Sequence, residues 1–156
     1  MGPDMSIRGG CKCNNIQILW HTIDRSLVPR ECQCSYCLLN RFSYVSKAGT
    51  RFKVSIHREA LYSIHQQVMG GARFHRCDNC GELVFATSEI EGELYGALNA
   101  NCLNNPSGFG ASVNTNFNTQ TPLQKKKEWR QNWCYPVVIE DKAGSSNVMP
   151  SGKREL

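Results

Sequence analysis

The sequence lacks any apolar run approaching the roughly 20 residues that a membrane-spanning helix needs. Residues 1–8 contain no apolar stretch of the signal-peptide type, and no Asn-x-Ser/Thr acceptor for glycosylation occurs in the chain. These absences exclude the usual signatures of membrane-spanning and secreted proteins. We therefore expect no membrane association and a cytoplasmic location.

Strong charge is also missing. The 156 residues carry a net charge of +5, spread along the chain, and this mild excess does not mark a nucleic-acid-binding protein. A hydrophobic fraction of 40% is too high for a disordered chain. The length suits one domain with a moderate core that would benefit from added cross-links.

Long helical periodicity is missing as well, and the chain is predicted to be mainly β. Glycine turns separate short segments that alternate in polarity or are rich in β-branched and aromatic residues. One short helix is expected from Thr121-Pro122 to Trp129. An exposed loop is expected over residues 99–120, which are rich in Asn, Gly, Ser and Thr. The expected strands cover residues 16–20, 42–45, 52–56, 61–64, 83–85 and 135–139.

Cysteine is what the chain has in excess. Nine cysteines are present, and an odd count without a secretion signal argues against a disulfide framework. Seven of them form clusters: Cys11-x-Cys13, Cys32-x-Cys34-x-x-Cys37 and Cys77-x-x-Cys80. Clustered thiols in a reducing compartment are typical of a metal site.

The last cluster has the form of a zinc-binding turn, because the chain can reverse between the two cysteines and Gly81 follows them. Such a turn supplies two ligands, and two more must come from Cys11 and Cys13 or from the triplet. If the first pair completes a four-thiolate site, three cysteines remain. Three protein ligands with an open fourth position are typical of a catalytic zinc, and a sulfur-rich site favours a substrate thiol there.

These spacings resemble the family of glutathione-dependent formaldehyde-activating enzymes and centromere protein V. The resemblance covers residues 7–138 and is carried by Gly9-Gly10-Cys11-Lys12-Cys13, by Cys32-Gln33-Cys34-Ser35-Tyr36-Cys37, and by the segment from Phe74 through Cys80 to Leu83. Two weaker motifs accompany these three: Leu103-Asn104-Asn105-Pro106 and Lys126-Lys127-Glu128-Trp129.

The resemblance implies a β-tent fold, similar to Rab-accessory proteins and methionine sulfoxide reductase B, over residues 6–140, with a flexible tail over residues 141–156. It implies two zinc ions per chain. Cys11, Cys13, Cys77 and Cys80 would hold a structural zinc, and Cys32, Cys34 and Cys37 would hold a catalytic zinc and carry the reaction. The implied activity is that of a carbon–sulfur lyase or synthase acting on adducts of an aldehyde with glutathione or another thiol, such as S-hydroxymethylglutathione.

The sequence departs from the family pattern at several positions. Asn14 replaces a glycine, and asparagine enters left-handed conformations at modest cost. Gln33 replaces a histidine within the triplet, and Leu38 with Asn40-Arg41 replaces a more basic stretch. Changes near an open metal position would alter substrate choice before they altered the fold.

Other readings of the same residues stay open at this stage. A second structural site closed by His75 or His21, a redox dithiol, and metal-free turns are alternatives for the cysteine clusters. His75 is a candidate proton carrier, although a satisfied core histidine is the more common case. Four basic side chains are candidates for steering the carboxylates of a thiol substrate, each against a solvated charge: Arg41, Arg51, Lys53 and Arg73.

Two other classes of function are considered. A non-catalytic zinc module could bind nucleic acid or protein through Lys125-Lys126-Lys127 and Trp129, although a charged helix face is the simpler interpretation. Sulfoxide reduction would need Cys102 or Cys134 as a nucleophile, and burial of both as small apolar residues is the simpler interpretation. The sequence leaves the substrate and the oligomeric state open.

Overall fold

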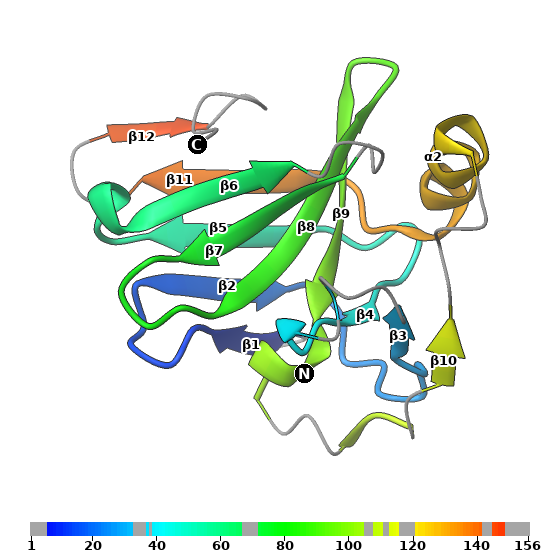
Figure 1. Cartoon of the computed structure of the whole chain (residues 1–156), viewed down its shortest axis with the longest axis horizontal. Coiled ribbons are helices and arrows are strands. Elements are labelled where there is room, and N and C mark those ends of the chain that lie inside the picture. Colours follow the sequence, from blue (N-terminus) through cyan, green and yellow to red (C-terminus); the bar gives the residue numbers. More distant parts are fainter. Residues whose placement is uncertain are drawn as a thin grey trace.

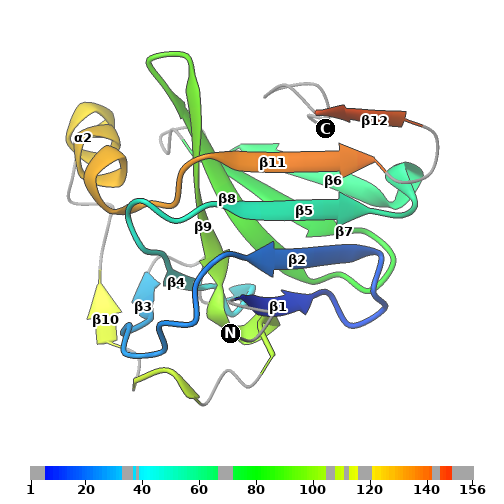
Figure 2. The same cartoon turned by 180° about the vertical axis from the view of Figure 1, so that it is seen from behind.

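The structure is a computed structural model, and it describes residues 6–32, 37, 39–66, 72–104, 108–110, 113–115, 121–141 and 145–148. The chain in these ranges is mainly β, as expected, and forms two sheets that face each other (Figures 1 and 2). Within the described ranges, no helix combines the length and the apolar character needed to cross a bilayer.

The first sheet has five strands in the order β1-β2-β5-β11-β12. Its strands pair antiparallel except for β11, which runs parallel to β5. The bounds are β1 (Ile7–Gly10), β2 (Ile16–Trp20), β5 (Phe52–Ile56), β11 (Val137–Asp141) and β12 (Ser145–Val148).

The second sheet has seven strands in the order β10-β3-β4-β9-β8-β7-β6. It is antiparallel except for the pair of β10 and β3. The bounds are β10 (Val113–Thr115), β3 (Arg30–Cys32), β4 (Ser43–Val45), β9 (Glu93–Asn99), β8 (Leu83–Ile90), β7 (Arg73–Cys77) and β6 (Tyr62–Gln66).

Two hydrophobic cores lie on the two faces of the seven-stranded sheet. The larger one fills the space between the sheets, where Trp20 and Phe52 of the first sheet and Phe85 and Leu98 of the second are all buried. The smaller one lies under α2 (Pro122–Asn132) and includes Phe74 and the two helix-end tryptophans. Burial on both faces explains why seven of the eight residues of β8 are buried, since Val84 and Phe85 enter the larger core and Leu83 and Ala86 enter the smaller one.

Helix α2 begins where the sequence predicts. Thr121 and Gln124 form a reciprocal capping box, and Pro122 fills the first turn, where a missing N–H costs nothing. Trp129 and Trp133 are one helical turn apart and stack with ring centroids 4.4 Å apart. Lys125 and Trp129 are only 6% and 4% exposed and face the sheet, whereas Lys127 is exposed.

Each predicted strand overlaps an observed strand, with shifts at the ends. The predicted ranges are 16–20, 42–45, 52–56, 61–64, 83–85 and 135–139. The expectation of an exposed loop over residues 99–120 is wrong in part. Ala100, Cys102, Leu103 and Phe109 are buried, and β10 lies within this range. The apolar side chains of this segment anchor it to the core, but they are too sparse to form a periodic pattern in the sequence.

The segment expected to be a flexible tail also contains a strand. The backbone of β12 pairs with β11, with Glu140 opposite Val148 and Asp141 opposite Ser145. Unpaired backbone groups at a sheet edge can bind a further strand whatever its side chains, and composition alone does not reveal this.

Gly96 lies where the sheets approach most closely. Its backbone bridges to Cys134, and a Cβ atom added at Gly96 would lie 2.7 Å from Cζ of Phe52 and 2.8 Å from Cγ2 of Val137. We predict that Gly96→Ala lowers the free energy of unfolding by ~1–3 kcal/mol because the core is overpacked there. Urea denaturation measures this. Gly110→Ala, whose Cβ would lie 3.3 Å from Cγ2 of the exposed Val28 and 3.7 Å from the carbonyl oxygen of Leu27, is the matched control with little expected change. Equal stability of the two variants would contradict the prediction.

Candidate metal centre

Four cysteine sulfurs converge at one end of the molecule. The Sγ atoms of Cys11, Cys13, Cys77 and Cys80 all lie within 4.8 Å of one another. Cys13 Sγ is 3.6 Å from Cys11 Sγ and 3.5 Å from Cys77 Sγ. Sulfurs bound at about 2.3 Å to one tetrahedral zinc ion would lie roughly 3.8 Å apart. The spacing and the all-sulfur donor set therefore fit zinc, and these four residues can hold a metal ion.

The first pair of cysteines lies in the turn between β1 and β2. The N–H of Asn14 donates to the carbonyl of Cys11, and Asn14 has a φ of 66°. The N–H of Ile16 donates to Cys11 Sγ at 3.3 Å. Asn14 thus takes the left-handed conformation that the turn requires.

The second pair lies in the turn between β7 and β8. Gly81 has a φ of 82°, and its N–H donates to the carbonyl of Cys77 at 2.8 Å. Ser63 Oγ donates to the carboxylate of Asp78 inside this turn. Glycine suits position 81 because most residues with a side chain are strained at such a φ.

Two side chains connect the turns to each other and to the core. Glu82 accepts a hydrogen bond from the N–H of Lys12 at 2.7 Å, and so links the residue between the first two cysteines to the end of the second turn. Asn15 is 5% exposed, donates to the carbonyl of Leu61 and accepts from the N–H of Arg58. Satisfied buried amides of this kind fix the backbone that carries the ligands.

The protonation of the sulfurs is unequal. Burial raises the pKa of the Cys11 thiol to about 12, and burial also raises the pKa of Cys77. Cys13 is exposed, and hydrogen bonds from the Asn79 side chain and the Asn15 backbone lower its pKa to about 6. The four sulfurs cannot all become thiolates without a cation, so metal binding would displace protons from the buried members.

The site cross-links the two sheets. Cys11 and Cys13 belong to the five-stranded sheet, whereas Cys77 and Cys80 belong to the seven-stranded sheet. A metal ion held by all four would close the open end of the larger core.

The triplet is only partly described. Cys32 ends β3, where its backbone pairs with Thr115, and Cys34 lies outside the described residues. Cys37 is 2% exposed, and its Sγ lies 3.7 Å from the hydroxyl of Tyr44. A metal site formed by these three cysteines stays a prediction.

His75 is a satisfied core histidine. It is 2% exposed, its Nδ1 is hydrogen-bonded to the Tyr62 hydroxyl, and its Nε2 is 2.7 Å from Oγ1 of Thr87. Its ring stacks on Phe85 at a centroid distance of 4.0 Å. Both ring nitrogens are engaged, so His75 neither closes the triplet nor serves as an accessible proton carrier.

The two remaining cysteines are buried, as expected. Cys102 is 6% exposed and Cys134 is fully buried, and burial raises the pKa of both thiols. A thiol attacks as its thiolate, so neither has the environment of a reactive nucleophile.

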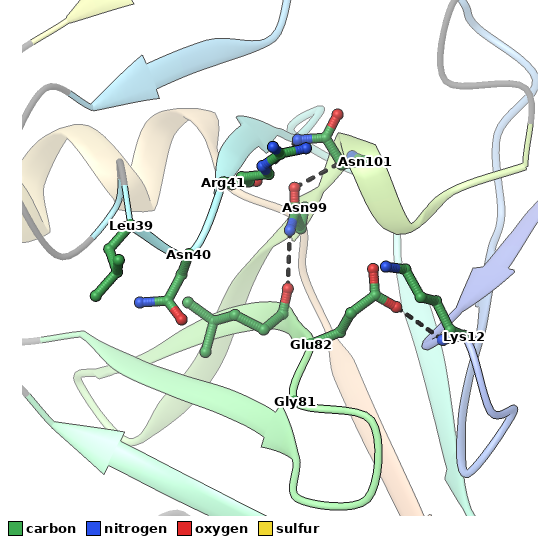
Figure 3. A pocket seen from close by; sticks show the side chains of 9 residues that line it. Lys12, Leu39, Asn40, Arg41, Gly81, Glu82, Asn99 and Asn101 are labelled. Atoms are coloured by element: carbon green, nitrogen blue, oxygen red, sulfur yellow. Dashed lines mark hydrogen bonds between the residues drawn. The ribbon is translucent and has the colours of Figure 1, made fainter.

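The chemical surroundings of the site include a polar cavity that the sequence did not reveal. It has a volume of about 380 Å³, and its lining includes Lys12, which lies between Cys11 and Cys13, and Gly81, which follows Cys80 (Figure 3). Lys12 and Glu82 line one side, and Arg41 and Asn101 line another. Arg41 is one of the four basic side chains that the sequence offers for steering the carboxylates of a thiol substrate. The cavity forms from four segments that are distant in the sequence, and for that reason no single motif marks it.

The comparisons with known proteins show a fold likeness only. No family model matches the sequence, and no curated protein matches it. Among solved structures, the chain is similar to a Rhodobacter sphaeroides protein whose crystal structure was determined as a target of Northeast Structural Genomics. The TM-score is 0.52 with 18% identity, over 68% of this chain and 99% of that one. The likeness establishes that this arrangement of strands occurs in another protein and says nothing of activity.

Removal of one cluster sulfur should release the metal. We predict that Cys80→Ser loses one equivalent of bound zinc and lowers the unfolding temperature by ~10 °C or more, because the cross-link between the sheets is lost. Elemental analysis and thermal unfolding measure the two effects. Cys102→Ser is the matched control, since Cys102 is buried close by but lies outside the cluster. Full metal content in the Cys80 variant would contradict the assignment.

Burial of His75 should make stability depend on pH. Its pKa is lowered from 6.5 to about 3 by burial and by the charge of Arg73, so between these values the unfolded chain binds a proton that the folded chain does not. The stabilisation present above pH 6.5 should thus be lost at ~1.4 kcal/mol per pH unit as pH falls through this window. Urea titrations in excess zinc measure the slope. His75→Gln should flatten it, whereas His65→Gln, on an exposed residue, should not.

Proposed function

We propose that the protein is a zinc-dependent carbon–sulfur lyase or synthase that acts on adducts of an aldehyde with a thiol such as glutathione. The observation that supports this proposal is the convergence of four sulfurs, those of Cys11, Cys13, Cys77 and Cys80. With these four grouped, Cys32, Cys34 and Cys37 are left as the candidate ligands of a second site. Three ligands leave a fourth tetrahedral position for a substrate.

The expected roles of the two metal sites follow from the family resemblance. The four-sulfur site would be structural, in a β-tent fold over residues 6–140. Cys32, Cys34 and Cys37 would hold a second zinc, whose chemistry when bound is to favour the thiolate form of a substrate thiol at neutral pH. In the synthetic direction a bond forms between the thiol sulfur and the aldehyde carbon, and the thiol proton ends on the former carbonyl oxygen.

The described residues limit which other groups take part. His75 is enclosed and doubly hydrogen-bonded, and the thiols of Cys102 and Cys134 are buried. Sulfoxide reduction through either of these thiols is therefore not favoured. The Tyr44 hydroxyl contacts Cys37 Sγ and can orient that sulfur by hydrogen bonding.

The alternative is a non-catalytic zinc module that binds nucleic acid or protein. The basic segment of α2 would carry that role, but Lys125 and Trp129 face the core. A stacking platform for bases needs an exposed aromatic ring. We favour the enzyme for this reason.

Metal stoichiometry tests the proposal. We predict two zinc ions per chain, of which only one is displaced or spectrally perturbed by millimolar glutathione, because a closed four-thiolate site has no position for a further thiol. Elemental analysis across a glutathione titration measures this. Cys37→Ser should retain one zinc that is insensitive to thiol. The same variant should lose the formation of S-hydroxymethylglutathione from formaldehyde and glutathione, followed by NMR. A single thiol-insensitive zinc in the unmodified protein would disprove the proposal.

A further inference from the structure

The polar cavity of Figure 3 takes no part in the proposed function. It has a volume of about 380 Å³, which lies within the range of small-molecule sites. Its walls come from the two turns that carry the clustered cysteines, from the turn before β4 and from the end of β9. The lining that the structure describes contains no cysteine, so a molecule bound there does not need a thiol.

The charges on the cavity wall favour a ligand with one negative charge. Lys12 and Glu82 lie on one side and Arg41 lies on another (Figure 3). Among the described residues, the side chains of Lys12 and Arg41 form no ion pair. Two cations and one carboxylate leave the wall with an excess of one positive charge. A monoanion complements this wall, whereas Glu82 opposes a second negative charge on the ligand.

The backbone of Arg41 is strained. Its φ is 54°, in the left-handed region that glycine enters freely and arginine does not. The Asn101 side chain donates to the carbonyl of Arg41 at 2.8 Å, and the N–H of Phe42 donates to the carbonyl of Cys37 at 3.0 Å. These two bonds hold a turn that presents a guanidinium to the cavity at a cost in stability. Strain of this kind is typical of positions whose side chain serves binding.

The uncharged part of the lining is rich in amides. Asn40 and Asn101 line the cavity together with Asn99, which is 3% exposed and is fixed by bonds to the N–H of Ser43 and the carbonyl of Leu83. An amide side chain both donates and accepts hydrogen bonds, and so does a hydroxyl group. The wall therefore suits a ligand with several hydroxyl groups better than a hydrocarbon.

We propose that this cavity binds a polyhydroxy carboxylate, a small molecule of the sugar-acid class. The guanidinium of Arg41 holds the carboxylate, and the amides and Glu82 bind the hydroxyl groups. The site is separate from the triplet, and the proposal does not depend on the proposed function. Because Lys12 lies between two clustered cysteines and Glu82 follows the second pair, the bound molecule contacts both turns of the metal centre.

NMR titration of the ¹⁵N-labelled protein in excess zinc tests the proposal. The ligands are gluconate, sorbitol, which lacks the carboxylate, and acetate, which lacks the hydroxyl groups. We expect gluconate to bind about tenfold more tightly than either, because one charge-assisted hydrogen-bond pair is lost with sorbitol and several hydroxyl contacts are lost with acetate. The backbone N–H signals of Lys12, Arg41 and Gly81 should shift. Equal affinities for gluconate and sorbitol, or shifts that leave these three signals unmoved, would overturn the proposal.

A pair of arginine variants tests the contact with the carboxylate. Arg41→Met should reduce the affinity for gluconate about tenfold and leave that for sorbitol unchanged. Arg51→Met is the matched control, because Arg51 is likewise exposed but lies outside the lining of the cavity. An equal effect of the two substitutions on gluconate binding would contradict the role of Arg41.

Arg41→Gly separates binding from stability. This variant should lose gluconate binding as Arg41→Met does, yet its unfolding temperature should rise by about 2 °C because the strained φ is relieved. Thermal unfolding in excess zinc measures the second effect. A lower unfolding temperature would make Arg41 a stabilising residue of the turn and would overturn its assignment to a ligand.

Two further ligands distinguish this site from its alternatives. Tighter binding of glucose 6-phosphate than of gluconate would overturn the choice of a carboxylate. Competition between glutathione and gluconate at the same N–H signals would assign the cavity to the thiol substrate, and the proposal of a separate site would fail. Failure of the proposed function would leave gluconate binding intact, since neither the ligand nor the lining carries a thiol.

Discussion

The convergence of four sulfurs from two different sheets is the constraint on which the rest of the structure depends. Cys11 and Cys13 lie in the β1–β2 turn, and Cys77 and Cys80 lie in the β7–β8 turn. A bound metal ion would fasten the open end of the larger core, while the bridge between Gly96 and Cys134 fastens β9 to the chain leading into β11. A domain of this size gains much from such a cross-link because its core alone is moderate.

Buried polar residues carry this constraint into the rest of the fold. Asn15 ties the first cysteine turn to the segment before β6. Asn99 accepts from the N–H of Ser43 and donates to the carbonyl of Leu83, and so connects β9 to β4 and β8. Each amide is satisfied in the core, which makes the arrangement specific because a displaced amide would leave backbone groups unpaired.

Asn99 also lines the cavity that holds Lys12 and Glu82. Tyr44, whose hydroxyl contacts Cys37 Sγ, lines a separate cavity with Lys47. A closed four-sulfur site offers no position for a substrate, whereas a set of three sulfurs does.

The sequence by itself determined what depends on neighbouring residues. Alternation of polarity and β-type residues identified β2, β4, β5, β6, β8 and β11 but not β7 or β9. Thr121-Pro122 identified the start of the helix, and the Cys-x-x-Cys-Gly spacing identified a ligand turn because that turn closes within five residues. The family resemblance added which pair of cysteines joins which. Asn14 could be expected to keep a left-handed turn, and it does.

Only the tertiary structure decided what depends on packing between distant segments. His75 and Trp129 have side chains that often serve a function. His75 is instead a buried core residue with both ring nitrogens hydrogen-bonded, and Trp129 is a core residue under α2 that stacks on Trp133. The contact between Cys37 and Tyr44 joins the segment that follows β3 to β4, which pairs with β3. Lys47 is held in place by its ion pair with Asp24, which is distant in the sequence. Such contacts arise from the free energy of the whole packed core, which no local pattern of residues records.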